Sequence, residues 1–544
     1  MPIRSTAITT PTLSAPIPNV SRLRRSPEPM LAFCGGAVVS IASPGRYRRP
    51  SLALQTPTGQ AQPLPSHSFA AKILPGSILL NDLARPPVPM RNRAARLNNI
   101  LRLVALACCA TLLTSSPANA QHLRDRISEL FIFGPGQDPL FLAGSGDPNN
   151  PASLQAHGLH FIPSSNAENA SLIAFITDAL GASVANIPIG STSGGETFRF
   201  EGGVPVRTST SAGPIFAERA QTLGRGRVLA GISRTGFKFA TLRGVDMHDI
   251  GLTFTHQNVD FDGCDAQFGG DCSLYGVPVL ENDAMDFHLS MDLSVQVTSI
   301  YVTYGVTDRF DFGLVVPVVQ ADFRGASEAQ IRPFGGTTAA HYFAGTPDNP
   351  VLTASRQSLG SAAGLGDVAL RAKVNLRETS DASFAFLVDG RFPTGSQKDL
   401  LGSGKFAGRA VLIFNSRFSD FSPHLNAGYL HHAGTQQNDA VLGTVGFDDR
   451  MNDNVTLAAD LVTELQVGDS KLHLPGLVTY DAPFRRTLVP TNIPEIRDDI
   501  VNGSFGFKFT PARNTTGVLN ALFPLNRGGL RSNLVYTAGI EYTF

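Results

Sequence analysis

The sequence lacks tryptophan and has few charged side chains. Asp, Glu, Lys and Arg make up only 16% of the 544 residues, against roughly 25% in an ordinary soluble domain. The formal net charge is zero, but residues 1–120 carry 13 basic and only 2 acidic side chains. The remaining residues carry 31 basic and 42 acidic side chains, a net charge of −11. This balance excludes a basic nucleic-acid-binding protein for most of the chain.

Long hydrophobic runs and catalytic motifs are also missing. Outside one apolar run at 103–113, no stretch approaches the roughly 18 apolar residues of a transmembrane helix, which excludes a polytopic helical membrane protein. The sequence contains no nucleophile elbow, CxxC or HExxH motif, and the glycine-rich stretch 190–195 lacks the lysine of a phosphate loop. We therefore expect no catalytic site, no cofactor and no metal.

The first 120 residues have the composition of segments that are not part of a folded domain. Residues 1–89 contain 15 prolines and show no period of 2 or 3.6, which predicts a disordered extension. Residues 90–120 show a basic start, an apolar middle and a small-x-small cleavage site ending at Ala120, as in a secretory signal peptide. We expect the mature chain to begin at Gln121. The simplest explanation is that translation starts at Met90, and a genuine N-terminal extension is the alternative.

Cysteine usage agrees with export. Of the five cysteines, only Cys264 and Cys272 fall after the predicted signal peptide. Two cysteines this close in an exported protein predict a loop disulfide. The alternative is a metal site, which is poorly supported because no histidine lies nearby.

Alternation of apolar and polar residues with a period of two is the main feature of the mature chain, and it predicts β-strands. The longest example, 285–301, has lapses only at Ser299 and Ile300. We predict about thirteen strands, near 227–241, 248–259, 285–305, 309–322, 366–376, 382–394, 406–418, 421–433, 438–448, 454–467, 502–512, 516–525 and 533–544.

The length and spacing of these strands favour a membrane barrel over a soluble sandwich. Sandwich strands average 5–6 residues, whereas membrane barrels need about 9–11 residues and alternate short turns with long loops. Single-chain bacterial barrels have even strand numbers. We therefore predict an all-β, transmembrane antiparallel β-barrel of about 12–14 strands over 196–544, with 197–210 as a candidate fourteenth strand. Residues 121–195 do not alternate, and we expect a periplasmic arm or a plug segment there.

The residue pattern of the C-terminal strand indicates which membrane the barrel occupies. Tyr536, Ile540, Tyr542 and Phe544 occupy one face, and the chain stops on Phe544. This pattern resembles the terminal strand of bacterial outer-membrane barrels, which the barrel-assembly machinery recognises. It implies a location in the bacterial outer membrane, with outer-membrane lipid and that machinery as partners.

Charged residues alternate with the apolar face of the predicted strands. In a barrel these charges line a wet lumen. The predicted lumen-lining residues are Asp311, Arg371, Lys373, Asp389, Arg391, Arg409, Arg417, Asp460, Glu464 and Lys508. Just before the first strand, Glu218 and Arg219 with Arg225 and Arg227 form either an ion-paired corner or a solvated run of charges.

Several segments resemble one known family. Gly213-Pro-Ile-Phe-Ala-Glu-Arg-Ala220, Thr303-Tyr-Gly-Val-Thr-Asp-Arg-Phe-Asp-Phe-Gly-Leu-Val-Val-Pro317, Gly364-Leu-Gly-Asp-Val-Ala-Leu-Arg-Ala-Lys373 and the terminal strand are similar to outer-membrane transporters associated with meta-pathway degradation of phenol and other aromatics. That family is distantly similar to long-chain fatty-acid and hydrocarbon channels. The resemblance covers roughly 190–544 and implies a channel for small hydrophobic or aromatic solutes, by passive or facilitated diffusion.

Two other functions stay open from the sequence. Outer-membrane lipases exist, and His424 or His432 on the lumen face has Ser416 and Ser422 nearby in sequence, so a lipid hydrolase is one alternative. His431 falls on the apolar face. A structural barrel without transport is the other alternative.

Overall fold

The computed structural model describes residues 122–133, 143–144, 198–201, 204–207, 211–255, 283–333, 341–346, 348–434, 437–472, 474, 476–480, 485–512 and 514–544. All of them belong to one compact unit, 87–544. The predicted disordered extension, the signal peptide and the Cys264–Cys272 disulfide lie outside the described residues. In the part of the chain that is described, no helix is long and apolar enough to cross a membrane.

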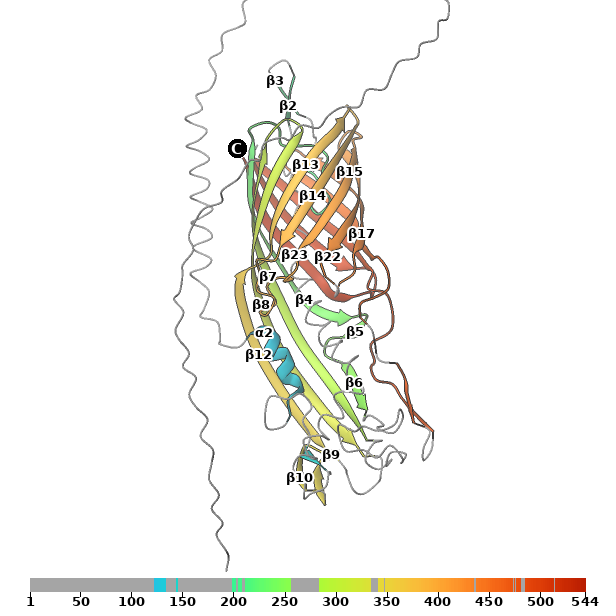
Figure 1. Ribbon diagram of the computed structural model, residues 1–544. Helices are drawn as coiled ribbons and strands as arrows, with labels where there is room; N and C mark the ends of the chain where they lie inside the picture. Colours follow the sequence, from blue (N-terminus) through green and yellow to red (C-terminus); the bar gives the residue numbers. More distant parts are fainter. Residues whose placement is uncertain are drawn as a thin grey trace, which may run out of the picture. The chain divides into compact units, whose positions relative to one another are not determined.

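Antiparallel strands of the described residues close into a twelve-stranded barrel (Figure 1). Consecutive barrel strands are neighbours, and the last strand pairs with the first to close the ring. The prediction of an antiparallel barrel of 12–14 strands is confirmed, at twelve. In chain order the strands are β4 (Val228–Leu242), β7 (Ala284–Gly305), β8 (Phe310–Arg332), β13 (Val368–Glu378), β14 (Ala382–Phe392), β15 (Ala407–Ser416), β16 (Phe421–His432), β17 (Ala440–Asn452), β18 (Val455–Gln466), β21 (Ile500–Ala512), β22 (Thr515–Pro524) and β23 (Leu530–Thr543).

The two ends of the barrel differ. At one end, called the short-turn end, only short connections such as 306–309 and 379–381 join the strands. The C-terminus lies at this end, where the backbone N–H of Phe544 donates to the carbonyl of Val228 over 2.7 Å. At the other end, called the loop end, connections such as 467–499 are long. This asymmetry is typical of outer-membrane barrels.

The outer surface of the barrel carries an apolar belt. Leu412, Leu519 and Ile540 expose 58%, 51% and 52% of their surface, although large apolar residues normally avoid water. The alternating residues on the inner face are buried and include charged and amide side chains such as Asp389, Asn415 and Lys508. In a closed barrel, each strand in the ring has a hydrogen-bonded neighbour on both sides, which is what hydrocarbon requires. The barrel is therefore built to span a lipid bilayer.

A four-stranded sheet continues from the barrel at the loop end (Figure 1). β7 and β8 are 22 and 23 residues long and run past the barrel. There β6 (Ile250–Thr255) pairs with β7, and β12 (Thr353–Leu365) pairs with β8. We call this four-stranded part the extension.

The two faces of β7 exchange character where the extension begins. In the barrel, Val302 and Tyr304 face outward, but farther along the same outer face are polar residues such as Gln296 and Asp292. The inner face changes the opposite way, from Thr303 in the barrel to Leu293 in the extension. The lapses in the alternation, Ser299 and Ile300, lie at this exchange. The extension is therefore apolar inside and polar outside, as expected of a structure in water.

An amphipathic helical segment fills the inner face of the extension. It consists of α2 (Leu123–Ser128) and the 3₁₀ turn η1 (Glu129–Phe131). The ring of Phe131 stacks on Phe287 with centroids 4.6 Å apart, and Ser327 Oγ donates to the Leu130 carbonyl over 2.6 Å. Leu123, Ile127, Leu130 and Phe131 are buried with Phe287, Met291 and Phe323 of the sheet in the largest apolar core of the described residues.

Three strand predictions need correction. The strand predicted at 248–259 is β6, which belongs to the extension and not to the barrel. No strand was predicted between 322 and 366, but 324–362 contains the last part of β8 and all but the end of β12. The candidate strand 197–210 contains β2 (Phe198–Glu201) and β3 (Val204–Arg207), a separate two-stranded sheet.

The remaining strands are short. β5 (Val245–Asp246) pairs with the end of β4. Six others form three two-stranded sheets: β1 (Ala143–Gly144) with β9 (His341–Tyr342), β10 (Ala344–Thr346) with β11 (Asn349–Val351), and β19 (Val478–Tyr480) with β20 (Arg486–Leu488). Backbone hydrogen bonds from 490–492 cover the free edge of β6, so that edge is closed to further pairing.

Candidate functional site: the barrel lumen

The lumen is occupied at its short-turn end by the segment that precedes the first barrel strand. Residues 211–223, called the plug, are almost all buried, with Ala217 and Ala220 at 0% exposure. Gly213 adopts φ +88, and a Cβ there would lie 2.7 Å from Cζ of Arg219. Glycine thus lets the plug fold back under its own arginine.

Side chains from several barrel strands hold the backbone of the plug. The Ala212 N–H donates to Thr456 Oγ1 (2.9 Å) and the Ala220 N–H to Asn415 Oδ1 (2.7 Å). Asn375 Nδ2 donates to the Ala220 carbonyl (3.0 Å). Asn426 can pair with both backbone groups of Glu218, Lys373 Nζ donates to the Arg219 carbonyl, Lys508 Nζ donates to the Ala212 carbonyl, and the Leu223 N–H donates to Asp311.

Ion pairs reinforce this attachment. Arg219 Nη2 lies 3.2 Å from Asp448 Oδ2, and Glu218 Oε1 lies 3.3 Å from Arg371 Nη1. Ser211 Oγ also donates to Asp448. The sequence allows either an ion-paired corner or a solvated run of charges for 218–227. Glu218 and Arg219 form ion pairs, and their partners are lumen residues of the barrel wall. Arg225 is exposed, and its backbone N–H donates to Asp308.

Apolar contacts also hold the plug against the barrel wall. Ile215 is buried with Ala458 and Val518, and Leu223 is buried with Tyr301 and Val315. Sequence reasoning did not single out 211–223 as a plug, because its partners are polar side chains spread over eight strands, β8, β13 to β18 and β21, that no local pattern connects.

Eight of the ten predicted lumen charges fall into two groups in the described structure. Nearest the short-turn end, Asp311, Lys373 and Lys508 hold the plug. Above them, toward the loop end, Arg371, Asp389, Arg391 and Arg409 form a connected cluster, and Glu464 lies in the electrostatic field of Arg391, Arg409 and Arg531. Arg417 lies in the β15–β16 turn, where its guanidinium donates to the Ser380 carbonyl.

The arginine cluster surrounds one carboxylate. Arg371 Nε lies 2.5 Å from Asp389 Oδ2, Arg409 Nη2 lies 3.4 Å from the same oxygen, and Arg391 Nε lies 3.7 Å from Oδ1. Three guanidinium groups thus share a single aspartate. Arg531 donates to the Val501 carbonyl and Asn502. Sequence reasoning missed it because the terminal strand was predicted to begin at 533, whereas β23 begins at Leu530.

Among the described residues, His424 has no serine partner. Its Nε2 lies 2.6 Å from Asp460 Oδ1, and its Nδ1 lies 3.5 Å from Asp448 Oδ1. A hydrolytic dyad requires a serine within hydrogen-bond reach of the ring, and both ring nitrogens face carboxylates. His431 and His432 contact Asp439 and the Asn438 carbonyl in the β16–β17 loop.

The residues of the predicted assembly signal lie on the outer face of β23. Tyr536, Ile540, Tyr542 and Phe544 expose 52%, 52%, 44% and 49% of their surface. The rings of Tyr542 and Phe544 pack edge to face with centroids 4.6 Å apart. Tyr and Phe thus provide the aromatic side chains at the short-turn end of the belt, a position that tryptophan often shares in other membrane proteins.

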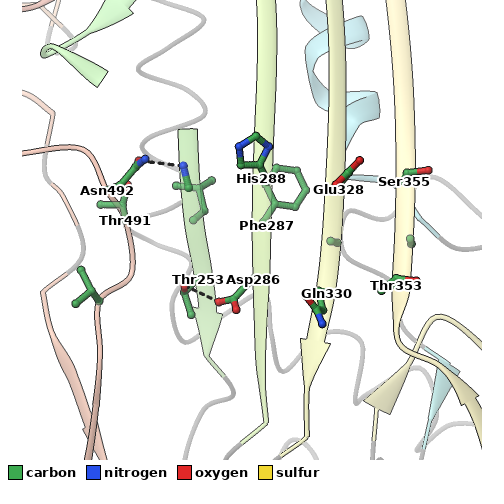
Figure 2. Close-up of a pocket in the computed structure, with 15 residues that line it drawn as sticks. Thr253, Asp286, Phe287, His288, Glu328, Gln330, Thr353, Ser355, Thr491 and Asn492 are labelled. Atoms are coloured by element: carbon green, nitrogen blue, oxygen red, sulfur yellow. Dashed lines mark hydrogen bonds between the residues drawn. The ribbon is translucent and has the colours of Figure 1, made fainter. Parts of the chain in front are cut away.

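Apart from the lumen, a hollow of about 720 Å³ lies on the polar outer face of the extension (Figure 2). Asp286, His288 and Glu328 line it, on the face opposite the apolar core. Thr253 Oγ1 donates to Asp286 Oδ1 over 2.9 Å, and the Gly251 N–H donates to Asn492 Oδ1. Among the described residues, no group of three His, Cys, Asp or Glu is arranged for a metal ion.

Comparisons with known proteins agree with the family that the sequence resembles. The model of the family described as "Putative MetA-pathway of phenol degradation" matches residues 275–481, which confirms the resemblance over that part of the chain. Comparison with curated proteins gave no match.

Solved structures of barrels overlap with much of the chain at low similarity. An outer-membrane channel from Pseudomonas putida F1 is 11% identical with a TM-score of 0.33, over 60% of this chain and 98% of that chain. A FadL homologue from Pseudomonas aeruginosa is 10% identical with a TM-score of 0.27, over 58% and 89%. A TodX monoaromatic hydrocarbon channel mutant is 12% identical with a TM-score of 0.26, over 58% and 89%. These values are too low to transfer a substrate or a mechanism.

Proposed function

We propose that the protein is a bacterial outer-membrane channel for small hydrophobic or aromatic solutes, which it passes by passive or facilitated diffusion. The observation that carries the proposal is the exchange of faces along β7 and β8. The same strands line an apolar interior in the extension and a polar lumen in the barrel. In the extension, phenylalanine and methionine side chains are buried under α2 and η1, so an apolar solute would have to displace this helical segment before it reaches the polar lumen.

The family match over 275–481 supports the same solute class. The short-turn end, with the C-terminus and the plug, would then face the periplasm. Outer-membrane lipid would contact the apolar belt, and the assembly machinery would recognise the terminal strand.

A structural barrel without transport is the second candidate, and the plug favours it because it fills the short-turn end. Reconstituted vesicles separate the two. Phenylalanine is an aromatic solute that crosses lipid slowly, so swelling in phenylalanine should be faster with the protein than in protein-free vesicles. Vesicles that swell no faster in phenylalanine or in any smaller solute would favour the structural barrel. A lipid-hydrolysis assay on the same vesicles tests the hydrolase alternative, and we expect no product above background.

A further inference from the structure

We propose that His424 is a pH switch for the plug, and that the proton on its ring holds Asp448 in the position in which Asp448 binds the plug. Loss of that proton releases the plug from the barrel wall. The proposal rests on the proposed channel function and adds a control over the state of the lumen.

The first observation is that His424 lies between two buried carboxylates. Its Nε2 is 2.6 Å from Asp460 Oδ1, and its Nδ1 is 3.5 Å from Asp448 Oδ1. All three side chains have 0% exposure. Among the described atoms Asp448 Oδ1 makes no hydrogen bond, so the ring of His424 is the cationic partner of this oxygen.

The second observation is that the sheet is built for the longer of these two reaches. His424 on β16, Gly446 on β17 and Asp460 on β18 are directly opposite one another. A Cβ at position 446 would clash with Oδ1 of Asp460. The missing side chain of Gly446 therefore lets Asp460 reach across a whole strand to the histidine.

The third observation is that one carboxylate joins the histidine to the plug. Oδ2 of Asp448 accepts from Ser211 Oγ and lies 3.2 Å from Arg219 Nη2. Its other oxygen, Oδ1, faces the ring of His424. A displacement of Asp448 therefore disturbs two contacts of the plug at once.

The balance of charges and donors in this row depends on the proton. A protonated imidazole has two N–H donors, whereas a neutral one has a donor and an acceptor, and an ionised carboxylate only accepts. The protonated ring therefore serves both aspartates and, together with Arg219, balances their two negative charges.

Loss of the proton removes this balance. Nε2, which has the shorter contact, keeps its hydrogen, so the lone pair of Nδ1 then faces Asp448 Oδ1. The buried row also gains a net negative charge, which is costly. Both effects displace Asp448 and weaken its hold on the plug.

Charged groups on two further elements act on this row. On β15, the residue directly opposite the histidine is the neutral Asn415. Lys508 of β21 lies in the electrostatic field of Asp448, and Arg417 of the β15–β16 turn lies in that of the plug's arginine. Because Lys508 also titrates and donates to the plug, the test has to separate the lysine from the histidine.

The experiment measures exposure of the plug by cysteine labelling. Ala217, in the middle of the plug, is fully buried, so the thiol of Ala217→Cys reacts with iodoacetamide only when the plug leaves the wall. The rate is measured for the purified protein in detergent micelles from about pH 6 to about pH 10, across the histidine range and above it. Division by the rate of the urea-unfolded chain at the same pH removes the ionisation of the thiol itself. Protein without the substitution gives the background from the other cysteines.

Three variants are compared in the Ala217→Cys background. His424→Gln carries one donor and one acceptor, as the neutral ring does, and leaves Lys508 unchanged. Asp460→Asn keeps both plug contacts of Asp448 but removes one of the carboxylates that favour a protonated ring. His431→Gln is the matched control, because it removes an exposed histidine–aspartate contact from the same strand. Heat-modifiable migration verifies that each variant folds.

We expect the labelling ratio of the wild type and of His431→Gln to be low at the acidic end. It should rise about tenfold or more as pH increases, as the loss of a hydrogen bond to a charged group predicts. His424→Gln should show the high ratio at every pH, and Asp460→Asn should show the rise at lower pH than the wild type.

A ratio that does not change with pH in the wild type, or a rise that persists unchanged in His424→Gln, overturns the switch, even where vesicles swell in phenylalanine. If His424→Gln does not fold, an unshifted rise in Asp460→Asn overturns it instead. The expected labelling pattern without vesicle swelling at any pH overturns the proposed channel and leaves the switch.

Discussion

Replacing Leu370 by arginine should destabilise the barrel by placing a guanidinium in the apolar belt. Leu370 lies on the outer face of β13, opposite Leu314 on one side and Gly390 on the other, and exposes 37% of its surface. An arginine facing lipid costs about 2–4 kcal/mol near the bilayer midplane and less toward the interfaces. Because a factor of ten corresponds to about 1.4 kcal/mol, the full cost would reduce the folded-to-unfolded ratio by roughly 30- to 700-fold.

The matched control is the same substitution on the same outer surface but in the extension. Leu359 on β12 exposes 73% of its surface, and its neighbours on that face are polar. Its position opposite Arg324 adds a like-charge repulsion of some tenths of a kcal/mol. We therefore expect Leu359→Arg to cost under about 1 kcal/mol, because surface substitutions in water are usually within about 0.5 kcal/mol.

The assay is urea unfolding in phospholipid vesicles, followed by the gel migration of unheated samples, since the chain has no tryptophan for fluorescence. The shift in midpoint multiplied by the urea dependence gives the change in the free energy of unfolding. Equal costs for Leu370→Arg and Leu359→Arg would refute the reasoning. The outer surface of the barrel would then not lie in lipid, or the boundary at the extension would be misplaced.

The remaining predictions concern the plug, the two ends of the chain and one histidine. Asp448→Asn should free the plug, because removing one partner of a buried ion pair costs about 3–5 kcal/mol, and single-channel conductance should rise above that of the wild type. Deleting Phe544 should reduce the amount of compact, heat-modifiable barrel in the membrane fraction without blocking export. Mass spectrometry of the native N-terminus should find Gln121 first, and peptides from 1–89 in the envelope would contradict the predicted signal peptide. Hydrogen bonds that His248 donates to Asp292 and to Asp246 raise its pKa. The β5–β6 turn should therefore be most resistant to protease below the ordinary histidine value of about 6.5 and should lose this protection as pH rises through the raised value.

The barrel itself could be predicted from the sequence because lipid imposes a simple requirement on every strand. On β13 and β14, residues such as Leu370 and Phe384 must face hydrocarbon, so their alternation with Arg371 and Ser383 is regular enough to be seen. Each strand could be identified alone, without knowledge of its partners.

The extension was harder to predict because the requirement reverses there. Along β7 the alternation continues, but at Ser299 and Ile300 the apolar residues change from the face that lines the internal core of the extension to the face that contacts lipid. The sequence does not show which of the two faces is the inner one. β12, with Ser358, Gly360 and Ala362, has too little contrast between its faces to be recognised as a strand. β12 is held in the sheet by backbone pairing with β8.

The lumen site could be predicted only in part. Each lumen charge stands out on its own strand, as Asp389 and Arg409 do, but their convergence depends on the register between strands. The plug depends on side chains such as Asn375, Asn415 and Thr456, whose types carry no signal in isolation. Such long-range polar contacts can be recognised only in the folded, closed barrel.

The central claim, passage of small hydrophobic or aromatic solutes through the outer membrane, is tested most directly by uptake in living cells. The initial uptake rate of radiolabelled toluene at low concentration would be compared in a deletion strain carrying the wild-type gene, the Leu359→Arg gene or an empty vector. The account predicts that the two genes restore the same rate, several-fold above the vector. Equal rates in all three strains, with both proteins folded in the outer membrane, would contradict it.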